Sequence, residues 1–278
     1  MKLVVKIGGT LIEHASGRQK IARRIARIVR DGHQALLVHG GGKQLSEYLK
    51  QSGIASRFLD GLRLTTAETL DGVVKVFAGT VNHQLLAALY QAGVPAAGIS
   101  GVDGGCLVAE KLTGENGRDW GYVGRITKAN PRIWEVLLAG GVLPVMASLA
   151  VGEDGQIYNV NADQAAVACA VHLGADALIF LTDVDGVRDA QGRTIRCLEA
   201  EEISSLIESG TATGGMLAKL NAVREALAGN VERVHIVNGH SEDALESILS
   251  DEDEKGSAKE AGTAGTVVVR SLAALKRA

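Results

Sequence analysis

The chain has 278 residues, 46% of them hydrophobic, and a formal net charge of −3 from 29 basic and 32 acidic side chains. This length and this share of apolar residues are enough for a large buried core in one or two domains. The nearly balanced charge argues against nucleic acid and anionic membranes as partners. Small-molecule chemistry is therefore the function class that the composition favours.

No apolar run approaches the roughly 20 residues of a membrane helix, and the N-terminus enters a strand without the apolar segment of a signal peptide. The cysteines Cys106, Cys169 and Cys197 lie far apart and lack the spacing of a zinc site. We therefore expect reduced thiols in a cytoplasmic protein that binds no membrane.

Apolar runs alternate with amphipathic segments along the whole chain. Strands are predicted at 3–7, 35–40, 94–100, 142–148, 177–186, 233–239 and 266–270. Helices are predicted near 18–30, 43–52, 66–91, 130–139, 162–174, 199–208, 216–228 and 241–249. This alternation predicts an α/β fold of three layers, an open and mostly parallel sheet with helices on both faces. We expect a division near 172–176, with two α/β halves and a crevice between the carboxyl ends of their strands.

Two stretches interrupt the alternation. The segments 106–112 and 120–127 are typical of a β-hairpin, and 149–160 carries an Asp-Gly turn between short strands. We expect these strands to form antiparallel flaps at the edge of the sheet. The charged segment 250–265 consists mainly of small and polar residues and predicts a mobile loop before the last strand.

Lys6 lies in an apolar strand that ends at Gly8 and Gly9. An unpaired lysine in a buried strand is costly, so Lys6 either marks the end of the strand or binds an anion. Glycines between a strand and a helix let backbone N–H groups approach a phosphate, and the helix N-terminus adds a favourable dipole. A simple tight turn explains these two glycines equally well when the site is taken alone.

The segment LLVHGGGKQ at 36–44 places His39 and three glycines between a strand and a helix. Each glycine costs about 1 kcal/mol relative to alanine, unless φ is positive or a ligand approaches closely. The pattern favours a binding function for the glycines and a structural hydrogen bond for His39. The chain lacks GxxxxGK[ST], a GxGxxG after a strand and a GxSxG elbow, which argues against P-loop ATPases, Rossmann dehydrogenases and α/β-hydrolases.

Arg63 precedes Thr65 and Thr66, two candidate N-caps of the next helix. An arginine at such a junction can bind a carboxylate through two parallel hydrogen bonds, although an exposed loop arginine is the commoner case. The sequence leaves both explanations open.

In YNVNADQAA at 158–166, Asn159 and Asn161 point the same way if the backbone is extended, and Asp163 begins a helix. The two amides can hold a polar substrate, and Asp163 can align nearby lysines. The alternative is that Asn161 caps the helix.

Two further motifs follow in the second half of the chain. Asp183 and Asp185 in LTDVDGV at 181–187 suit a ribose or phosphate edge, with calcium ligation as the alternative. Lys219 lies in TGGMLAKLNA at 213–222, where a surface helical lysine is the ordinary explanation.

Taken in order, VVKIGG, HGGG, GLRLT, NVNADQAA, LTDVDGV and GGMLAKL resemble the motifs of the amino acid kinase family. The resemblance runs from residue 2 to about residue 269, and GLR with NVNADQ points to members that act on N-acetyl-L-glutamate in arginine biosynthesis. It implies the amino acid kinase fold, with acyl amino acid binding and dimerisation in lobe 1–173 and ATP binding in lobe 174–278. It also implies transfer of phosphate from ATP to the side-chain carboxylate, giving N-acetyl-L-glutamyl 5-phosphate.

The resemblance implies a role for each matching residue. Lys6 and Lys219 would stabilise the moving phosphoryl group, and Asp163 would orient both lysines. The other positions are assigned to N-acetylglutamate, namely Gly41, Gly42, Arg63 and Asn159, and to the nucleotide, namely Gly8, Gly9, Thr182 and Asp183.

A carboxylate is a competent nucleophile at neutral pH, so this reaction needs no general base, and positioning with fixed cations should carry most of the catalysis. Mg²⁺ is implied with ATP, held largely by phosphates and water rather than by a metal site of the protein. We expect a homodimer insensitive to arginine, because the sequence starts at its first strand without the extra N-terminal helix of arginine-inhibited hexamers. Two alternatives remain: a kinase for carrier-linked aminoadipate or glutamate, and a non-catalytic amino-acid sensor.

Overall fold

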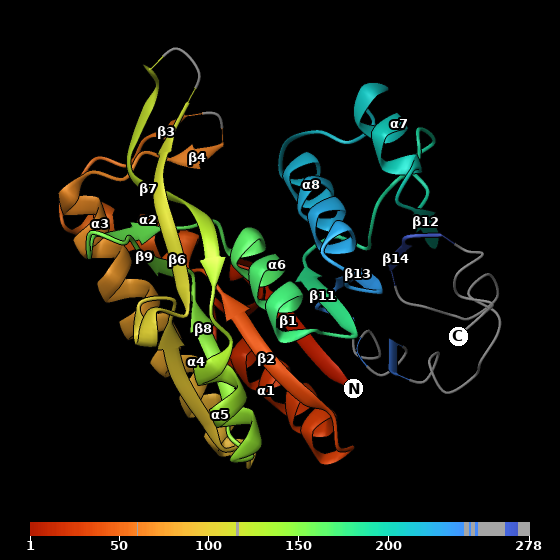
Figure 1. Ribbon diagram of the computed structural model, residues 1–278, viewed down its shortest axis with the longest axis horizontal. Helices are drawn as coiled ribbons and strands as arrows, with labels where there is room; N and C mark the ends of the chain where they lie inside the picture. Colours follow the sequence, from red (N-terminus) through yellow and green to blue (C-terminus); the bar gives the residue numbers. More distant parts are fainter. Residues whose placement is uncertain (60, 115–116, 242–244, 246–247, 250–264, 272–278) are drawn as a thin grey trace.

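The structure, a computed structural model, describes residues 1–59, 61–114, 117–241, 245, 248–249 and 265–271. Its centre is an eight-stranded sheet with helices on both faces (Figure 1). In spatial order the strands are β12 (Cys197–Glu199), β14 (Thr266–Val269), β13 (Arg233–Asn238), β11 (Ala177–Thr182), β1 (Lys2–Ile7), β2 (Gln34–His39), β8 (Leu143–Ala147) and β5 (Ala96–Ser100). In the described part of this sheet all neighbours are parallel except β13 and β14, which confirms a mostly parallel sheet.

The helices follow the predicted segments closely. They are α1 (Ala15–Arg30), α2 (Gly42–Gln51), α3 (Ala67–Val73), α4 (Asn82–Gln91), α5 (Arg132–Ala139), α6 (Ala162–Leu173), α7 (Glu202–Glu208) and α8 (Gly214–Ala228). Short 3₁₀ segments, η1 (Gly9–Ile12) and η3 (Asp103–Gly105), follow β1 and β5. The predicted helix 66–91 is continuous, but its centre is a π-helical segment, η2 (Val74–Val81), a form that is frequent at functional sites.

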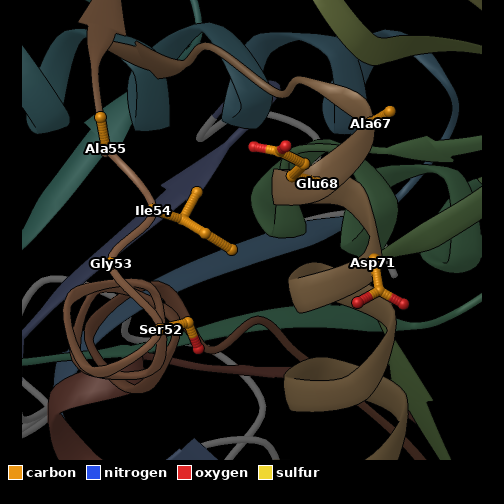
Figure 2. Close-up of a pocket in the computed structure, with 7 residues that line it drawn as sticks. All are labelled: Ser52, Gly53, Ile54, Ala55, Ala67, Glu68 and Asp71. Atoms are coloured by element: carbon orange, nitrogen blue, oxygen red, sulfur yellow. The ribbon is translucent and has the colours of Figure 1, made fainter.

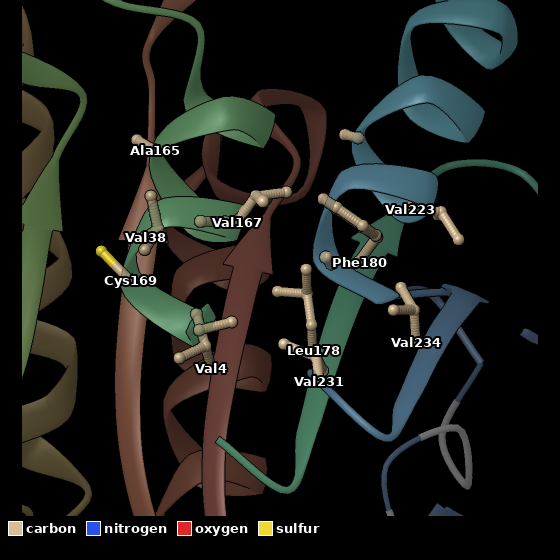
Figure 3. Close-up of a cluster of buried hydrophobic side chains, with 14 of the residues drawn as sticks. Val4, Val38, Ala165, Val167, Cys169, Leu178, Phe180, Val223, Val231 and Val234 are labelled. Atoms are coloured by element: carbon tan, nitrogen blue, oxygen red, sulfur yellow. The ribbon is translucent and has the colours of Figure 1, made fainter. Parts of the chain in front are cut away.

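The alternation of side chains along each strand supplies two separate cores. Leu3 and Val5 of β1 pack on the face covered by α1 and α4, whereas Val4 packs on the opposite face with α6 and α8. Figure 3 shows part of this second core, where side chains of β1, β2, β11 and β13 meet those of α6 and α8. Lys6 comes two residues after Val4 and therefore faces α6 and α8 as well.

The central strands end level with one another. Ile7 pairs with His39 of β2 and with Leu181 of β11, and His39 also pairs with Ala147 of β8. The loops that follow these strands therefore leave the sheet side by side. Because β1 is followed by β2 on one side and β11 by β13 on the other, the boundary between β1 and β11 is the kind of switch point at which open α/β sheets bind ligands.

The predicted hairpin forms, but the prediction of flaps at the sheet edge is wrong. The hairpin strands β6 (Leu107–Thr113) and β7 (Asp119–Ala129) close into a small barrel with β9 (Leu149–Val151) and β10 (Ile157–Asn159). Closure pairs backbone groups that free strand edges would leave exposed. A short hairpin of β3 (Phe58–Leu59) and β4 (Leu62–Arg63) is tied to β7 by a bridge between Thr65 and Gly121.

The C-terminal strand β14 forms where the sequence predicts it. The predicted loop 250–265 lies outside the described residues as far as position 264, as does most of the predicted helix 241–249. Within the described ranges, no helix has the length and apolar character needed to cross a membrane.

Candidate active site

Three charged side chains meet on the α6 and α8 face of the sheet. Lys6 Nζ lies 2.8 Å from Oδ1 of Asp163, and Lys219 Nζ lies 2.8 Å from Oδ2 of the same carboxylate. The exposed fractions of these side chains are 15% for Lys6, 14% for Asp163 and 10% for Lys219. One carboxylate thus holds two ammonium groups in a largely buried position, where net positive charge suits the binding of an anion.

The electrostatics of this cluster depend on Asp163. Burial alone would raise the pKa of Asp163, but the charges and hydrogen bonds of Lys6 and Lys219 outweigh burial and lower that pKa to about 2. Burial lowers the pKa of Lys219, while Asp163 opposes that shift and Lys6 adds to it. Asp163 is therefore ionised at neutral pH, and its charge allows the two lysines to lie close together.

Local features place the members of the cluster. Asn161 is the N-cap of α6, because its Oδ1 accepts the N–H groups of Asp163 at 2.8 Å and of Gln164 at 3.3 Å. The capping alternative for Asn161 is thus the correct one, and it fixes the turn that carries Asp163. Lys219 on α8 is only 8% exposed, so the alternative of a surface helical lysine is wrong.

The two glycines after β1 differ in whether their backbone N–H groups are available to a ligand. The N–H of Gly8 donates to Leu181 O at 2.8 Å, continuing the ladder between β1 and β11, so it is not available to a phosphate. A Cβ at Gly8 would lie only 3.0 Å from the same oxygen. Gly9 begins η1, where the first N–H groups have no partner within the helix, and a Cβ added there meets no described atom within 4 Å. The expected donor role therefore fits Gly9 and not Gly8.

His39 is fully buried and fixes the start of the HGGG turn. Its Nδ1 donates to Gly40 O at 2.8 Å, and its Nε2 accepts from Nδ2 of Asn82 at 3.0 Å. The same amide of Asn82 donates to Val145 O of β8 at 3.0 Å. Burial lowers the pKa of His39 to about 4, so the ring is neutral at physiological pH. The predicted structural role of His39 is confirmed.

Gly41 and Gly42 stand at the start of α2 for different reasons. A Cβ on Gly41 would lie 2.8 Å from Cδ1 of Phe77 and 3.1 Å from a methyl group of Val81, both in the π-helical segment. Packing therefore requires glycine at position 41. A Cβ on Gly42 meets nothing within 4 Å among the described residues, and the N–H groups in the first turn of α2 have no partner within the helix. Gly42 has room for a ligand beside it.

Arg63 at the end of β4 is only 8% exposed, so the alternative of an exposed loop arginine is wrong. Its guanidinium donates to Gly42 O at 2.9 Å, to Ser46 Oγ at 2.8 Å and to the hydroxyl of Ser56. It also lies 4.6 Å from the ring centroid of Phe58. None of these described partners is a carboxylate. Arg63 thus keeps a buried positive charge beside the N-terminus of α2, which is costly unless an anion binds there.

Asn159 is linked to Arg63 through Thr65. Nδ2 of Asn159 donates to Thr65 Oγ1 at 3.1 Å, and the hydroxyl of Thr65 donates to Arg63 O at 3.0 Å. Thr66 is the N-cap of α3, since it accepts from the N–H of Thr69 at 3.2 Å, and Thr65 is not a cap. The small barrel holds the link together, because Asn159 and Thr65 both bridge to β7.

Thr182 and Asp183 lie at the end of β11, on the other side of the switch point. Thr182 Oγ1 donates to Oδ1 of Asp183 at 3.3 Å, and Thr182 O accepts from the N–H of Gly239 at 2.8 Å. Asp183 is exposed, and its charge acts on Lys219. Asp185 accepts from Asn238 Nδ2 at 2.7 Å. Within the described ranges, no three His, Cys, Asp or Glu residues group closely enough to hold a metal ion.

A surface pocket of about 660 Å³ lies between the C-terminus of α2 and the start of α3 (Figure 2). In Figure 2 the side chain of Ile54 points into the gap between its own segment and α3. The full lining is Ser52, Gly53, Ile54, Ala55, Ala67, Glu68 and Asp71. The lining of this pocket shares no residue with the lysine cluster or with Arg63, and its described residues include no cation, so the pocket does not suit an anionic substrate.

The sequence motifs do not point to Phe180, which reads as an ordinary buried residue of β11. Its ring centroid lies 4.8 Å from Nζ of Lys219. Phe180 is also paired with Lys6 in the register of β1 and β11, so it lies on the same face of the sheet. The pairing of β1 with β11 reveals the position of Phe180 beside Lys6, and that pairing becomes known only with the strand order.

Comparisons with known proteins agree with this geometry. The model of the amino acid kinase family matches residues 1–238. The acetylglutamate kinase of Solibacter usitatus is 51% identical over 253 residues, covering 91% of this chain and 97% of the relative. The acetylglutamate kinase of Acidobacterium capsulatum is 46% identical over 250 residues, covering 90% and 95%.

Among solved structures, N-acetylglutamate synthase from Neisseria gonorrhoeae, complexed with coenzyme A and N-acetyl-glutamate, aligns with a TM-score of 0.82 and 29% identity. The alignment covers 97% of this chain and 59% of the synthase chain. The chain belongs to the amino acid kinase family. The expected family and fold class are thereby confirmed.

Proposed function

We propose that the chain transfers the γ-phosphoryl group of ATP to the side-chain carboxylate of N-acetyl-L-glutamate, the second step of acetylated arginine biosynthesis. The observation that carries this proposal is the pair of ammonium groups of Lys6 and Lys219 on the single carboxylate of Asp163. The high identity to relatives named acetylglutamate kinase over nearly their full length supports the choice of substrate.

The reaction brings two anions together. A carboxylate oxygen of the substrate attacks the γ-phosphorus, a new O–P bond forms, and the bond from the γ-phosphorus to the bridging oxygen breaks, which releases ADP. Negative charge spreads over the transferring group and the leaving diphosphate. We propose that Lys6 and Lys219 stabilise this negative charge and that Asp163 orients both lysines. Fixed cations in a site with little water stabilise developing negative charge most strongly.

The substrate side of the proposed site is built around Arg63. A buried guanidinium that has no carboxylate among its described partners suits the α-carboxylate of N-acetylglutamate. Asn159 is hydrogen-bonded to Thr65, and Thr65 to the backbone of Arg63, so we place the amide of Asn159 at the same carboxylate. Gly42 and Gly41 lie where the N-terminus of α2 meets Arg63, and we assign Gly42 and the backbone of Gly41 to the acyl amino acid, although packing against Phe77 by itself requires a glycine at position 41.

We assign Gly9, Thr182 and Asp183 to the nucleotide, and Gly8 to the packing that lets the phosphates approach. The strand order supports the proposed lobes, since the strands of residues 1–173 form one half of the large sheet and those of 174–278 the other. Mg²⁺ is part of the proposal as a partner of ATP, where it neutralises phosphate charge. Asp163 already holds two lysines, so we expect phosphate oxygens and water to hold the metal.

We further propose a cytoplasmic homodimer. Cys106 and Cys169 are buried and form no disulfide among the described residues, which suits a reducing compartment. The edge strand β5 has a strand neighbour on one side within the described sheet, and such an edge can accept a second copy. Light scattering of the purified protein tests the dimer, and a monomer or hexamer would contradict it.

A coupled assay of ADP release tests the activity. The protein should turn over N-acetyl-L-glutamate in preference to glutamate and aspartate, and hydroxylamine should trap the acyl phosphate. Asp163→Asn is the matched control, since this substitution keeps the shape of the side chain and removes the negative charge between the two lysines. Preference for a carrier-linked aminoadipate or glutamate, or binding of an amino acid by calorimetry without any ADP release, would contradict the proposal.

A further inference from the structure

Phe180 of β11 contacts the ammonium group of Lys219 with the face of its ring. The distance from Nζ to the ring centroid is 4.8 Å. Phe180 is 0% exposed and Lys219 is 8% exposed, so little water separates the two groups. Cation–π attraction operates over this distance and is strongest where solvent is excluded. Figure 3 shows Phe180 directed from β11 toward α8, the helix that carries Lys219.

The charges around Lys219 explain why a ring is useful at this point. Asp163 and Asp183 attract its ammonium group, and Lys6 repels it. The helix α7 and the strand β13 also pack on α8, and neither contributes a charged group to these interactions among the described residues. Because Asp163 is shared between two lysines, it cannot balance both. The negative face of an aromatic ring supplies additional favourable potential without adding a charge that repels phosphate.

We propose that Phe180 is a positioning residue whose ring holds the Lys219 ammonium group beside Asp163 and keeps it charged for the incoming phosphoryl group. The identity of that phosphoryl group rests on the proposed function, whereas the contact between ring and cation does not. An aliphatic side chain at position 180 would fill the same part of the core but would leave Lys219 with Asp163 as its one close partner among the described residues.

Substitution of Phe180 by mono-, di- and trifluorinated phenylalanine tests this role, because fluorine weakens the negative face of the ring and changes its volume little. Two readouts are needed: kcat and KM as functions of pH, and the titration of Lys219 followed by NMR of ¹³Cε-labelled lysine, assigned with Lys219→Arg. Phe180→Leu is the end point of the series. Leu178→Val is the matched control, since Leu178 is equally buried two residues earlier on the same face of β11.

We expect each added fluorine to lower the pKa of Lys219 and kcat at neutral pH stepwise, with KM for both substrates nearly constant. Phe180→Leu should lower that pKa by roughly 0.5 unit and kcat by roughly 3- to 10-fold. Leu178→Val should lower Tm without moving the titration. The inference is overturned if the fluorinated series leaves the Lys219 titration unchanged and Phe180→Leu only lowers Tm. A stepwise titration shift in a protein inactive toward N-acetylglutamate would support the inference and contradict the proposed function instead.

Discussion

Lys6 on β1 and Lys219 on α8 place their ammonium groups on opposite oxygens of the same carboxylate, that of Asp163. The two lysines are far apart in the chain and meet because β1 pairs with β11 while α6 and α8 cover the same face. We propose that this pair of fixed cations stabilises the phosphoryl group in transfer.

Removing either lysine should abolish most of the activity. We expect Lys6→Ala and Lys219→Ala each to lower kcat by roughly 100-fold or more, by analogy with the loss of one oxyanion donor. Steady-state kinetics with ATP and N-acetylglutamate measure this. Lys128→Ala is the matched control, because the Lys128 side chain is 68% exposed and pairs with Glu153. Near-normal kcat in either active-site variant would refute the role of that lysine.

Loss of Arg63 should affect the acyl amino acid and not ATP. We expect Arg63→Ala to raise KM for N-acetylglutamate by the equivalent of roughly 1.5–3 kcal/mol, since charged hydrogen bonds to the α-carboxylate are lost. KM for ATP should change little. Arg125→Ala, at an arginine that is 66% exposed and paired with Glu110, serves as the control. A selective rise in KM for ATP would mean that the two lobes have been assigned the wrong way round.

Alanine at the two adjacent glycines should separate packing from binding. Gly41→Ala should lower the free energy of unfolding by about 1–3 kcal/mol, because its Cβ would lie 2.8 Å from Phe77. Gly42→Ala adds a Cβ with no described atom within 4 Å, so it should leave Tm unchanged or raise it. If the substrate lies against Gly42, the same variant should raise KM for N-acetylglutamate. Thermal melts and kinetics of both variants provide the comparison, and equal loss of stability would contradict it.

Two buried histidines should make the protein sensitive to mild acid. Burial lowers the pKa of His39 from 6.5 to about 4 and that of His235 from 6.5 to about 3. Between pH 6.5 and about 4 the unfolded chain therefore binds up to two more protons at these positions than the folded protein. The free energy of unfolding should fall as pH decreases, with a slope of up to ~2.7 kcal/mol per pH unit. Asp163, with its pKa of about 2, loses its contribution only at still lower pH.

Urea denaturation at pH 7 and pH 5 measures this slope. Neither ring nitrogen of His235 has a partner within the described structure, so His235→Leu should raise stability at pH 7 by about 1 kcal/mol and halve the slope. His240→Gln, at an exposed position, is the control for the loss of a histidine. A destabilised His235→Leu variant with an unchanged slope would contradict the assignment.

Much of the fold could be predicted from local patterns. The alternation of apolar strands and amphipathic helices indicates the α/β class. Because successive side chains of a strand point to opposite faces of the sheet, the first strand already places Lys6 on the opposite face from Val5 and Ile7. The barrel could not be predicted in this way. Its closure depends on pairing between β9 and β6 and between β10 and β7, which local sequence does not specify.

The sequence by itself determined the family, the order of the motifs and the residue types that an acyl phosphate reaction needs, because these depend on side-chain chemistry and short spacing. The tertiary structure decided which groups are free to act. It engages the N–H of Gly8 with Leu181, buries Arg63 without a carboxylate partner in the described structure, and sets Phe180 against Lys219. Those contacts join residues far apart in the chain, so they follow from strand order, register and packing, which the spacing of residues along a segment does not determine.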